Sequence, residues 1–489
     1  MSTISAMVAG LEKALARAAL SDDREMAAKV REEGRRLVFL LGGLIRISRL
    51  YDPENSAYTG PSNDAAGALS GLLELLGAVH VVCVEDQIYI NDIRLRLGPT
   101  EQAAAEGFIV TLAAHKVGGL SLHDALRPDQ MKQLAMTFAR PPASSGHPRR
   151  SIRSQLASLT GVEVTGPYSF RIAGEVERRR RELASVFGQC DAVIKQQIRI
   201  LSAGRMPNPL PVRRSALELL EALRENPAEG LASPARRSAG LAGPQHLISV
   251  SGLAMLLGQA LGLPDAALSD LGVAAMLHDI GAVKRPDWTG HAAAGARILM
   301  RQRGFHEAKI RRLLVVLEHH LPYRESAEDG AAGDAAPSLF ARIVHVVDDY
   351  DALTASFPGG APAMSPALAL GFMWAARGVM YDRDLVALFV QLLGRFPPGS
   401  LMELSDGRWA VSVSGGRDRE RFAWPVVRIV RGADGHPPDV PETIDLYESR
   451  SRLQPRLLLD PTSRGHGPLQ SMVEGALRNP LLPDSSSIE

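Results

Sequence analysis

Hydrophobic residues recur at helical spacing over most of this chain. Residues 5–50 and 212–224 carry apolar positions three and four apart with charged residues between them, which predicts amphipathic helices. Residues 246–279 form two further apolar stretches separated by a Gly-Leu-Pro-Asp turn, which predicts a pair of helices. Helices therefore dominate the predicted fold.

Two regions instead alternate apolar and polar residues, as strands do. Residues 79–97 (VHVVCVEDQIYINDIRLRL) are rich in β-branched residues and predict a hairpin, with Glu-Asp-Gln at its turn. The sequence GGLSLH at 118–123 predicts another short strand. Residues 396–430 alternate around Gly-rich turns and predict a small β meander after the helices.

The chain is predicted to be mainly α and to contain several domains, because 489 residues are too many for one hydrophobic core. A cluster of Pro, Ser and Gly at 139–151 indicates a boundary. The predicted parts are an N-terminal α+β regulatory or sensory domain (1–145), a helical domain (172–395), a small β appendage (396–450) and a largely disordered tail (451–489).

Charge and cysteine content exclude several classes of protein. Lys and Arg total 55 and Asp and Glu total 54, so no global field attracts a nucleic-acid polymer or an acidic membrane. No stretch of about twenty apolar residues predicts a membrane span. The first twenty residues do not have the pattern of a secretory signal. Cys83 and Cys190 match no metal or redox spacing, which fits a cytoplasmic protein.

Histidine is concentrated in one part of the helical region. Seven of the thirteen histidines fall within one hundred residues: His246, His278, His291, His306, His319, His320 and His345. Taken alone, a His-Asp pair at 278–279 could simply end a helix, where His favours the helix dipole. Two adjacent histidines at 319–320 are harder to place in an apolar core, because they cannot share one helix face. The clustering therefore predicts a metal site.

The chemistry of these side chains indicates the ion and the reaction. Imidazole and carboxylate together suit iron, manganese, zinc, cobalt or nickel, whereas an all-oxygen site would favour magnesium or calcium. A carboxylate that bridges two such ions lets them share a water whose pKa is lowered, so that hydroxide can attack phosphorus. This combination predicts hydrolysis of a phosphoester.

The order of the motifs resembles the HD-GYP family of cyclic-dinucleotide phosphodiesterases, within the HD superfamily of metal-dependent phosphohydrolases. The order is His, then His-Asp, then His with Gly four residues later, then His-His, then DxYDALT. The similarity spans roughly residues 175–450 and includes the segment FPPGSLMELSDG, which looks like the β segment of that family. It implies an all-helical HD-type domain.

The resemblance also implies roles for individual residues. One divalent ion would be held by His246, His278, Asp279 and Asp348, and a second by Asp279, His291, His319 and His320. Asp279 would bridge the ions, and it forms the catalytic pair with His278. Iron or manganese is the expected metal. Asp351 would orient a ligand without binding metal, whereas His306, His345 and Asp349 receive no role.

The chain departs from the family pattern on the substrate side. Ala282 stands where the family has Lys, although Lys284 and Arg285 could supply positive charge to a substrate from nearby. Leu321 occupies the position of a family Glu, and the GYP motif is absent. The carboxylate that would support a third metal corresponds to Ala242. The predicted site is therefore binuclear.

The leading hypothesis is a cytoplasmic metal-dependent phosphohydrolase, specifically a phosphodiesterase for a cyclic dinucleotide (cyclic di-GMP) in bacterial signalling, controlled by its N-terminal domain. The alternative is a catalytically inactive signalling module that binds nucleotide, metal or a partner protein. Ligands can outlast catalysis, and the departures fall where substrate would bind. The sequence leaves open the native metal, the ligand of the N-terminal domain, and whether the chain forms a homodimer.

Overall fold

The computed structural model describes residues 23–459, with gaps at 85–86, 92, 96, 143–147, 167–182, 207, 235–242, 284–289, 302–306, 324–335, 356–362, 415–418, 439 and 441. The chain divides into two compact units. The first unit comprises Met1–Arg178, Gln197–Pro211 and Arg297–Ile310, and the second comprises Arg179–Gln196, Val212–Ala296 and Arg311–Glu489. Helices predominate in the described residues, as the sequence predicted.

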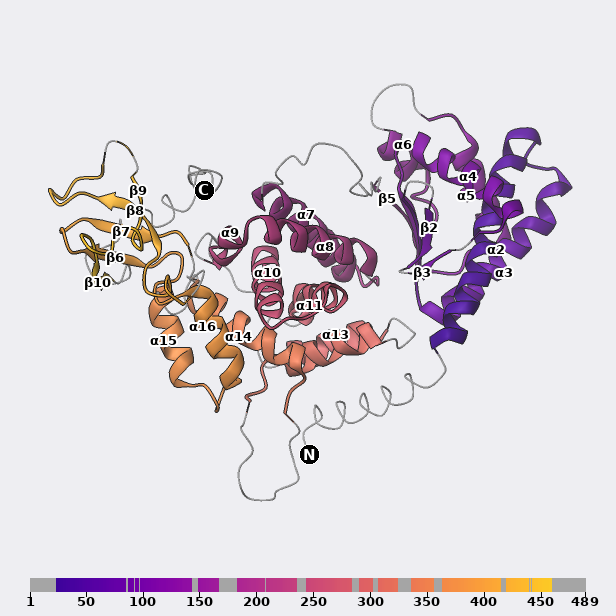
Figure 1. The fold of residues 1–489 in the computed structure, drawn as a ribbon. Coiled ribbons are helices and arrows are strands. Elements are labelled where there is room, and N and C mark those ends of the chain that lie inside the picture. Colours follow the sequence, from indigo (N-terminus) through magenta and orange to yellow (C-terminus); the bar gives the residue numbers. More distant parts are fainter. Residues whose placement is uncertain are drawn as a thin grey trace, which may run out of the picture. The chain divides into compact units, whose positions relative to one another are not determined.

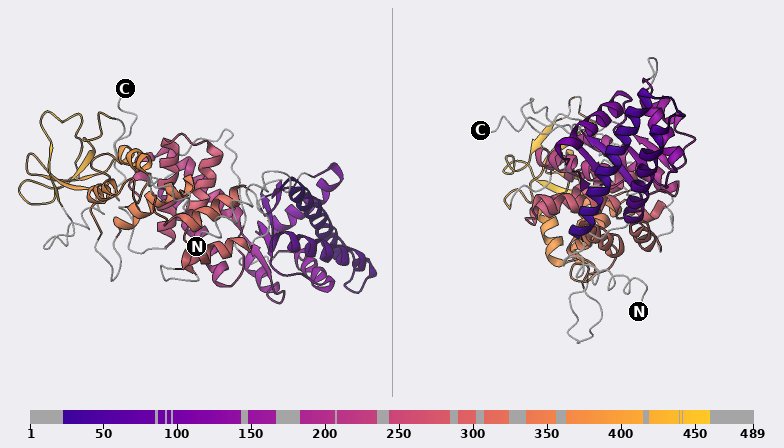
Figure 2. Two further views of the ribbon diagram at one scale, coloured as in Figure 1. Left: turned by 90° about the horizontal axis from the view of Figure 1, so that it is seen from below. Right: turned by 90° about the vertical axis from the view of Figure 1, so that its right-hand side faces the viewer.

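An antiparallel sheet of five strands lies at the centre of the first unit, in the order β3-β2-β1-β4-β5. Figures 1 and 2 show its helices packed on one face of the sheet. The strands are β1 (Val79–Val84), β2 (Gln87–Ile90), β3 (Ile93–Arg94), β4 (Gly119–Leu122) and β5 (Val162–Thr165). The helices are α2 (Asp23–Leu50), η2 (Ser56–Tyr58), α3 (Thr59–Leu76), α4 (Pro99–Ala114), α5 (Pro128–Ala139) and α6 (Pro148–Gln155).

The hairpin and the strand predicted from alternation are confirmed. Val82 pairs with Tyr89 across β1 and β2, and Val82 also pairs with Gly119 of β4. Successive side chains of a strand point to opposite faces. Val81 and Cys83 therefore lie in the core beneath the helices, whereas Val82 lies on the opposite face of the sheet.

The sheet extends beyond residue 145, where the sequence placed the end of the domain. Strand β5 pairs with β4, for example Val164 with Leu120. Leu210, from the segment Gln197–Pro211, packs on Val82 and on Val84 at the opposite face of the sheet. These contacts join residues far apart in sequence, so local patterns could not show them.

The second unit is built from helices around an apolar interior. They are α7 (Leu183–Ser202), α8 (Pro209–Glu225), α9 (Pro227–Leu231), α10 (Pro244–Ala260), α11 (Asp265–Leu277), η4 (Ile280–Val283), α12 (His291–Met300), α13 (Glu307–Glu318), α14 (Leu339–Leu353), α15 (Pro366–Ala375) and α16 (Arg383–Leu393). The parts of α7, α8, α12 and α13 that fall in Gln197–Pro211 and Arg297–Ile310 belong to the first unit. Helices α10 and α11 form the predicted pair, and Gly262 in the turn between them has φ +86°, which favours glycine. Both helices are buried over most of their length.

The segment Asp265–Val283 is long and apolar enough to cross a membrane by length and composition. However, 72% of its most apolar window is buried inside the protein, as expected for a core helix. Its His278 and Asp279 are also buried. The segment is thus part of the protein core, and the cytoplasmic location stays a prediction.

A second antiparallel sheet follows the helices and confirms the predicted C-terminal β structure. Its strand order is β10-β6-β7-β8-β9. The strands are β6 (Leu401–Leu404), β7 (Trp409–Ser412), β8 (Val426–Arg431), β9 (Thr443–Asp445) and β10 (Pro455–Leu459). The sheet continues past residue 450, the predicted end of the appendage, because β10 pairs with β6. The rest of the predicted disordered tail lies outside the described residues.

Candidate metal centre

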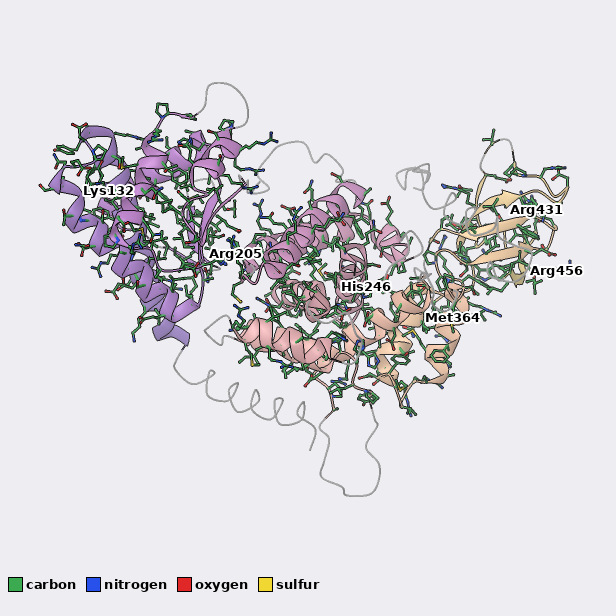
Figure 3. The ribbon with its side chains drawn as sticks, turned by 180° about the vertical axis from the view of Figure 1, so that it is seen from behind. Lys132, Arg205, His246, Met364, Arg431 and Arg456 are labelled. Carbon is green, nitrogen blue, oxygen red and sulfur yellow. The ribbon has the colours of Figure 1, made fainter. Side chains whose placement is uncertain are left out.

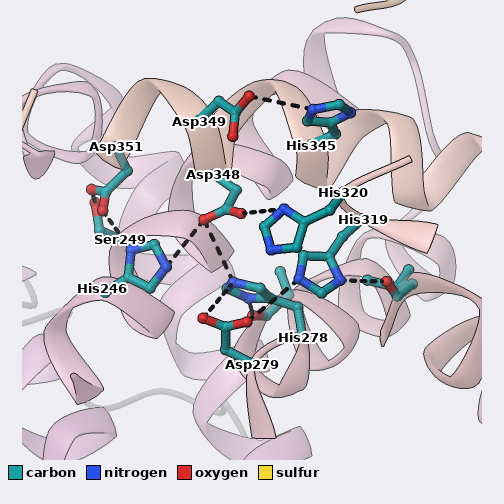
Figure 4. A network of polar contacts seen from close by, with 12 residues as sticks. His246, Ser249, His278, Asp279, His319, His320, His345, Asp348, Asp349 and Asp351 are labelled. Carbon is teal, nitrogen blue, oxygen red and sulfur yellow. Dashed lines mark hydrogen bonds and ion pairs between the residues drawn. The ribbon is translucent and has the colours of Figure 1, made fainter. Parts of the chain in front are cut away.

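The residues of the candidate site come from the ends and the middle of five helical segments of the second unit. His246 lies in the first turn of α10, and His278 and Asp279 lie between α11 and η4. His291 begins α12. The remaining members are His319 and His320, directly after α13, and Asp348 in α14. Figure 3 shows His246 within this helical region, and Figure 4 shows six of these residues close together, namely His246, His278, Asp279, His319, His320 and Asp348.

Two glycines allow α12 to approach the His-Asp turn. A Cβ atom on Gly281 would lie only 1.8 Å from the backbone oxygen of His291. A Cβ atom on Gly295 would lie 2.7 Å from a methyl carbon of Val316 in α13. No side chain fits at Gly281, so the glycines that follow Asp279 and His291 in the sequence bring these two ligands together.

The predicted ligand atoms gather into two neighbouring groups, and a third group that could hold a metal, His320, Asp348 and Asp349, overlaps both. Within each group, the candidate ligand atoms all lie within 4.8 Å of one another. One group contains His246, His278 and Asp348; the other contains Asp279, His291, His319 and His320. The structure therefore brings together all seven residues that were predicted to be ligands. They form the two predicted groups, except that Asp279 belongs to only one of them. Metal binding by these residues stays a prediction.

Asp279 nevertheless faces both groups. Its Oδ1 atom lies 3.1 Å from Nε2 of His291 and 3.4 Å from Nε2 of His319. Its Oδ2 atom lies 3.7 Å from Nε2 of His278, in the other group. A carboxylate with one oxygen toward each group has the arrangement that a bridging ligand needs.

The spacing of the nitrogen atoms suits ligands of a common cation. Nε2 of His291 lies 3.2 Å from Nε2 of His319. Two nitrogens bound about 2.1 Å from one ion at a tetrahedral angle would lie about 3.4 Å apart. Nε2 of His246 is 3.1 Å from Oδ1 of Asp348, and Nε2 of His278 is 3.6 Å from the same oxygen.

Several buried atoms of the site make no hydrogen bond within the part of the chain that the structure describes. Among them are Nε2 of His246, Nε2 of His278 and Oδ1 of Asp279, although each has an oppositely charged or polar atom close by. Leaving a buried polar atom without a hydrogen bond costs about 1–3 kcal/mol. Short separations without hydrogen-bond geometry are expected when atoms point at a shared cation instead of at each other, so the residues present fit a divalent metal.

The other ring nitrogen of three histidines is held by a fixed partner. Nδ1 of His246 lies 2.7 Å from Oδ2 of Asp351. Nδ1 of His278 lies 2.7 Å from the carbonyl oxygen of Ala275, and Nδ1 of His319 lies 3.0 Å from that of Val315. These acceptors require the proton on Nδ1, which leaves Nε2 as the metal-binding nitrogen.

Asp351, which was predicted to orient a ligand, contacts the candidate ligand His246, and its role stays a prediction. It accepts a hydrogen bond from Oγ of Ser249 at 2.6 Å in addition to its contact with His246. Ser249 was missed at the sequence level. The one feature of the sequence that could have indicated Ser249 is its position three residues after His246, which puts both on the same face of α10.

Burial and charge act against each other on the titratable groups. Burial lowers the pKa of His246, but the Asp348 and Asp351 carboxylates outweigh it and raise this pKa to about 10. Burial opposes ionisation of Asp348 too, yet His278 and His246 hold its pKa well below the usual range. Burial and the neighbouring His319 lower the pKa of His320 to about 4. The site thus favours ionised carboxylates, the form that binds metal.

Lys284 and Arg285, which were predicted to contact substrate, lie outside the described residues. Ala242 also lies outside them. Ala282 is partly exposed in the turn that contains Gly281, and Leu321 is partly exposed after His320. Neither side chain carries the charge that the HD-GYP pattern has at the corresponding position.

Comparison with known proteins agrees with the helical fold of this region. Residues 245–353, which contain all seven candidate ligands, match the HD domain family. This segment of the chain is an HD domain.

Two curated relatives are similar to this chain over longer stretches than the HD domain. A cyclic di-GMP phosphodiesterase of Pseudomonas aeruginosa is 24% identical over 349 residues, covering 68% of this chain and 82% of the relative. The cyclic di-GMP phosphodiesterase response regulator RpfG of Xanthomonas campestris pv. campestris is 29% identical over 251 residues, covering 45% of this chain and 63% of the relative.

Proposed function

We propose that this protein is a metal-dependent phosphodiesterase that hydrolyses cyclic di-GMP in bacterial signalling. The observation that supports this most is the position of Asp279, with one carboxylate oxygen toward each of two His/Asp groups. Two relatives named cyclic di-GMP phosphodiesterases support the substrate. We propose two ions per chain, iron or manganese, because imidazole and carboxylate are mixed at the site.

The side chains of the site would have the following roles. Asp279 would bridge the ions, and His246, His278 and Asp348 would hold one of them while His291, His319 and His320 hold the other. When bound, the ions supply Lewis acidity, which activates a water near neutral pH and neutralises charge on the phosphate. Backbone carbonyls and Asp351 keep the imidazoles oriented. Burial of the ligands limits the access of bulk water.

A catalytically inactive signalling module is the second candidate. It is favoured by the loss of charged residues on the substrate side, where Ala282 and Leu321 stand at the family's Lys and Glu positions. Among the described residues, every group able to hold a metal lies in the second unit. We propose a regulatory role for the first unit under either reading.

Metal analysis and turnover distinguish the two candidates. The full chain is purified, reconstituted with iron(II) or manganese(II), and assayed with bis(p-nitrophenyl) phosphate and cyclic di-GMP. We expect two ions per chain and cleavage of both substrates, lost in Asp279→Asn and retained in Asp434→Asn. Asp434 is the matched control, because this carboxylate is exposed in a turn and, among the described residues, accepts a hydrogen bond only from the backbone N–H of His436. Two ions without turnover would support the signalling module.

A further inference from the structure

Among the described residues, the candidate site reaches solvent on one side. The side chain of His320 is 29% exposed, whereas His278 and His319 are fully buried. The other candidate ligands are at most 4% exposed: His246, Asp279, His291 and Asp348. A substrate phosphate would therefore approach the metals past His320, and the residues beside His320 are in a position to select the substrate.

Asp349 lies at this opening. Its side chain is 29% exposed, as is that of His320. One of its oxygens lies within 4.8 Å of a ligand atom of His320 and of one of Asp348. No ligand role was predicted for Asp349, yet it places a carboxylate within reach of a molecule bound at the metals.

The Asp349 carboxylate is held in one orientation. The hydroxyl of Tyr381 donates to Oδ2 of Asp349 at 2.8 Å, and Nε2 of His345 lies 3.3 Å from the same oxygen. The ring of His345 also packs edge-on against Tyr381, which is buried. Figure 4 shows one oxygen of Asp349 turned toward His345 and the other toward Asp348. Because both contacts use Oδ2, Oδ1 remains available to accept a hydrogen bond at the opening.

We propose that Asp349 determines specificity for ribose by accepting a hydrogen bond from the sugar 2′-hydroxyl next to the scissile phosphate. This inference rests on the proposed phosphodiesterase function. In a 3′,5′-linked nucleotide, the 2′-hydroxyl is on the carbon adjacent to the one that bears the bridging oxygen. A phosphate bound at the metals would thus bring this hydroxyl close to the rim where Asp349 lies. Carboxylates are known to bind ribose hydroxyls in this way.

Charge also favours a hydroxyl as the partner of Asp349. A carboxylate repels a phosphate oxygen and accepts only from a donor, so it selects against a misplaced phosphate while it binds the sugar. The base is a less suitable partner, because it is attached on the far side of the 2′-carbon and Asp349 lies close to the ligand atoms of the centre.

The experiment compares three substrates with the metal-loaded full chain: cyclic di-GMP, its 2′-deoxy counterpart, and bis(p-nitrophenyl) phosphate, which has no sugar. For the original protein, we expect kcat/KM for the ribose substrate to exceed that for the deoxy substrate about 10- to 100-fold, the range for a hydrogen bond to a charged group. Asp349→Ala should remove this preference while cleavage of bis(p-nitrophenyl) phosphate and metal content stay unchanged. Tyr381→Phe should reduce the preference in part, and Asp434→Ala should leave it intact.

Two outcomes would overturn the inference while leaving the phosphodiesterase function in place. One is equal cleavage of the ribose and deoxy substrates by the original protein. The other is a loss of metal, or of bis(p-nitrophenyl) phosphate cleavage, in Asp349→Ala, which would make Asp349 a metal ligand. If no substrate is cleaved, the proposed function fails, and equilibrium binding of the two cyclic dinucleotides then tests the same preference without turnover.

Discussion

At the scale of single residues, we expect His246 to couple metal binding to pH. Its pKa is raised from 6.5 to about 10 in the metal-free protein by Asp348 and Asp351, against the opposing effect of burial. The protonated form therefore stabilises the fold fully below about pH 6.5, and this contribution is lost as the pH rises through about 10. A metal ion at Nε2 must displace a proton, because only the deprotonated nitrogen binds metal.

We predict that metal affinity rises with pH between about 6.5 and 10, and that binding at pH 8 releases a proton from His246. Calorimetric titration of the metal-free protein in buffers of different ionisation enthalpy measures the number of protons released. The released proton should be absent in His246→Ala. Binding without proton release in the original protein would show that the imidazole is already neutral.

A second prediction at the residue scale concerns Asp351. The Asp351 carboxylate contacts His246 and accepts a hydrogen bond from Ser249, and Asp351→Asn removes its negative charge. Loss of such a supporting carboxylate typically lowers metal affinity about 10- to 100-fold. Competition with a chelator of known affinity measures this change. Ser249→Ala, which removes a single contact to Asp351, should have a smaller effect, and equal effects of the two variants would contradict the assignment.

At the scale of elements, the approach of α12 to the His-Asp turn decides whether the second group of ligands forms. Gly281→Ala would place a methyl group 1.8 Å from the backbone oxygen of His291, so α12 must shift. We predict that this variant keeps its helical circular dichroism but loses at least half of the bound metal and nearly all phosphodiesterase activity. Gly371→Ala in α15 is the control, because its Cβ would meet open space. Full activity of Gly281→Ala would contradict the prediction.

At the scale of the whole molecule, the two units have separate cores, and among the described residues only the second unit contains the candidate metal centre. The largest apolar core of the first unit is formed by residues between Val30 and Val164, whereas every group able to hold a metal in the described residues lies in the second unit. A ligand that binds only the folded state stabilises that state by about 2.7 kcal/mol at a free concentration one hundred times its dissociation constant.

We therefore predict two thermal transitions, of which manganese(II) raises only one. Differential scanning calorimetry of the full chain with manganese(II) or with a chelator measures this difference. The shift should disappear in Asp279→Asn. A uniform shift of both transitions would mean that the units unfold together.

The sequence by itself determined the helical class, the two β segments and the identities of the candidate ligands. Periodicity reports which face of a helix or strand is buried, and a set of imidazoles and carboxylates in a fixed order indicates metal chemistry whatever the path of the chain. Both signals can be read from the sequence without knowledge of the fold. The match of residues 245–353 to the HD domain family was likewise found from the sequence.

Only the tertiary structure decided which atoms meet. The pairing of β5 with β4 and of β10 with β6 joins distant residues, so the domain ends placed at 145 and 450 by composition fall short of the sheets. The two-sided position of Asp279 and the exposure of Asp349 beside His320 also depend on how helices pack. Orientation and access are properties of three-dimensional packing, and a linear pattern contains neither.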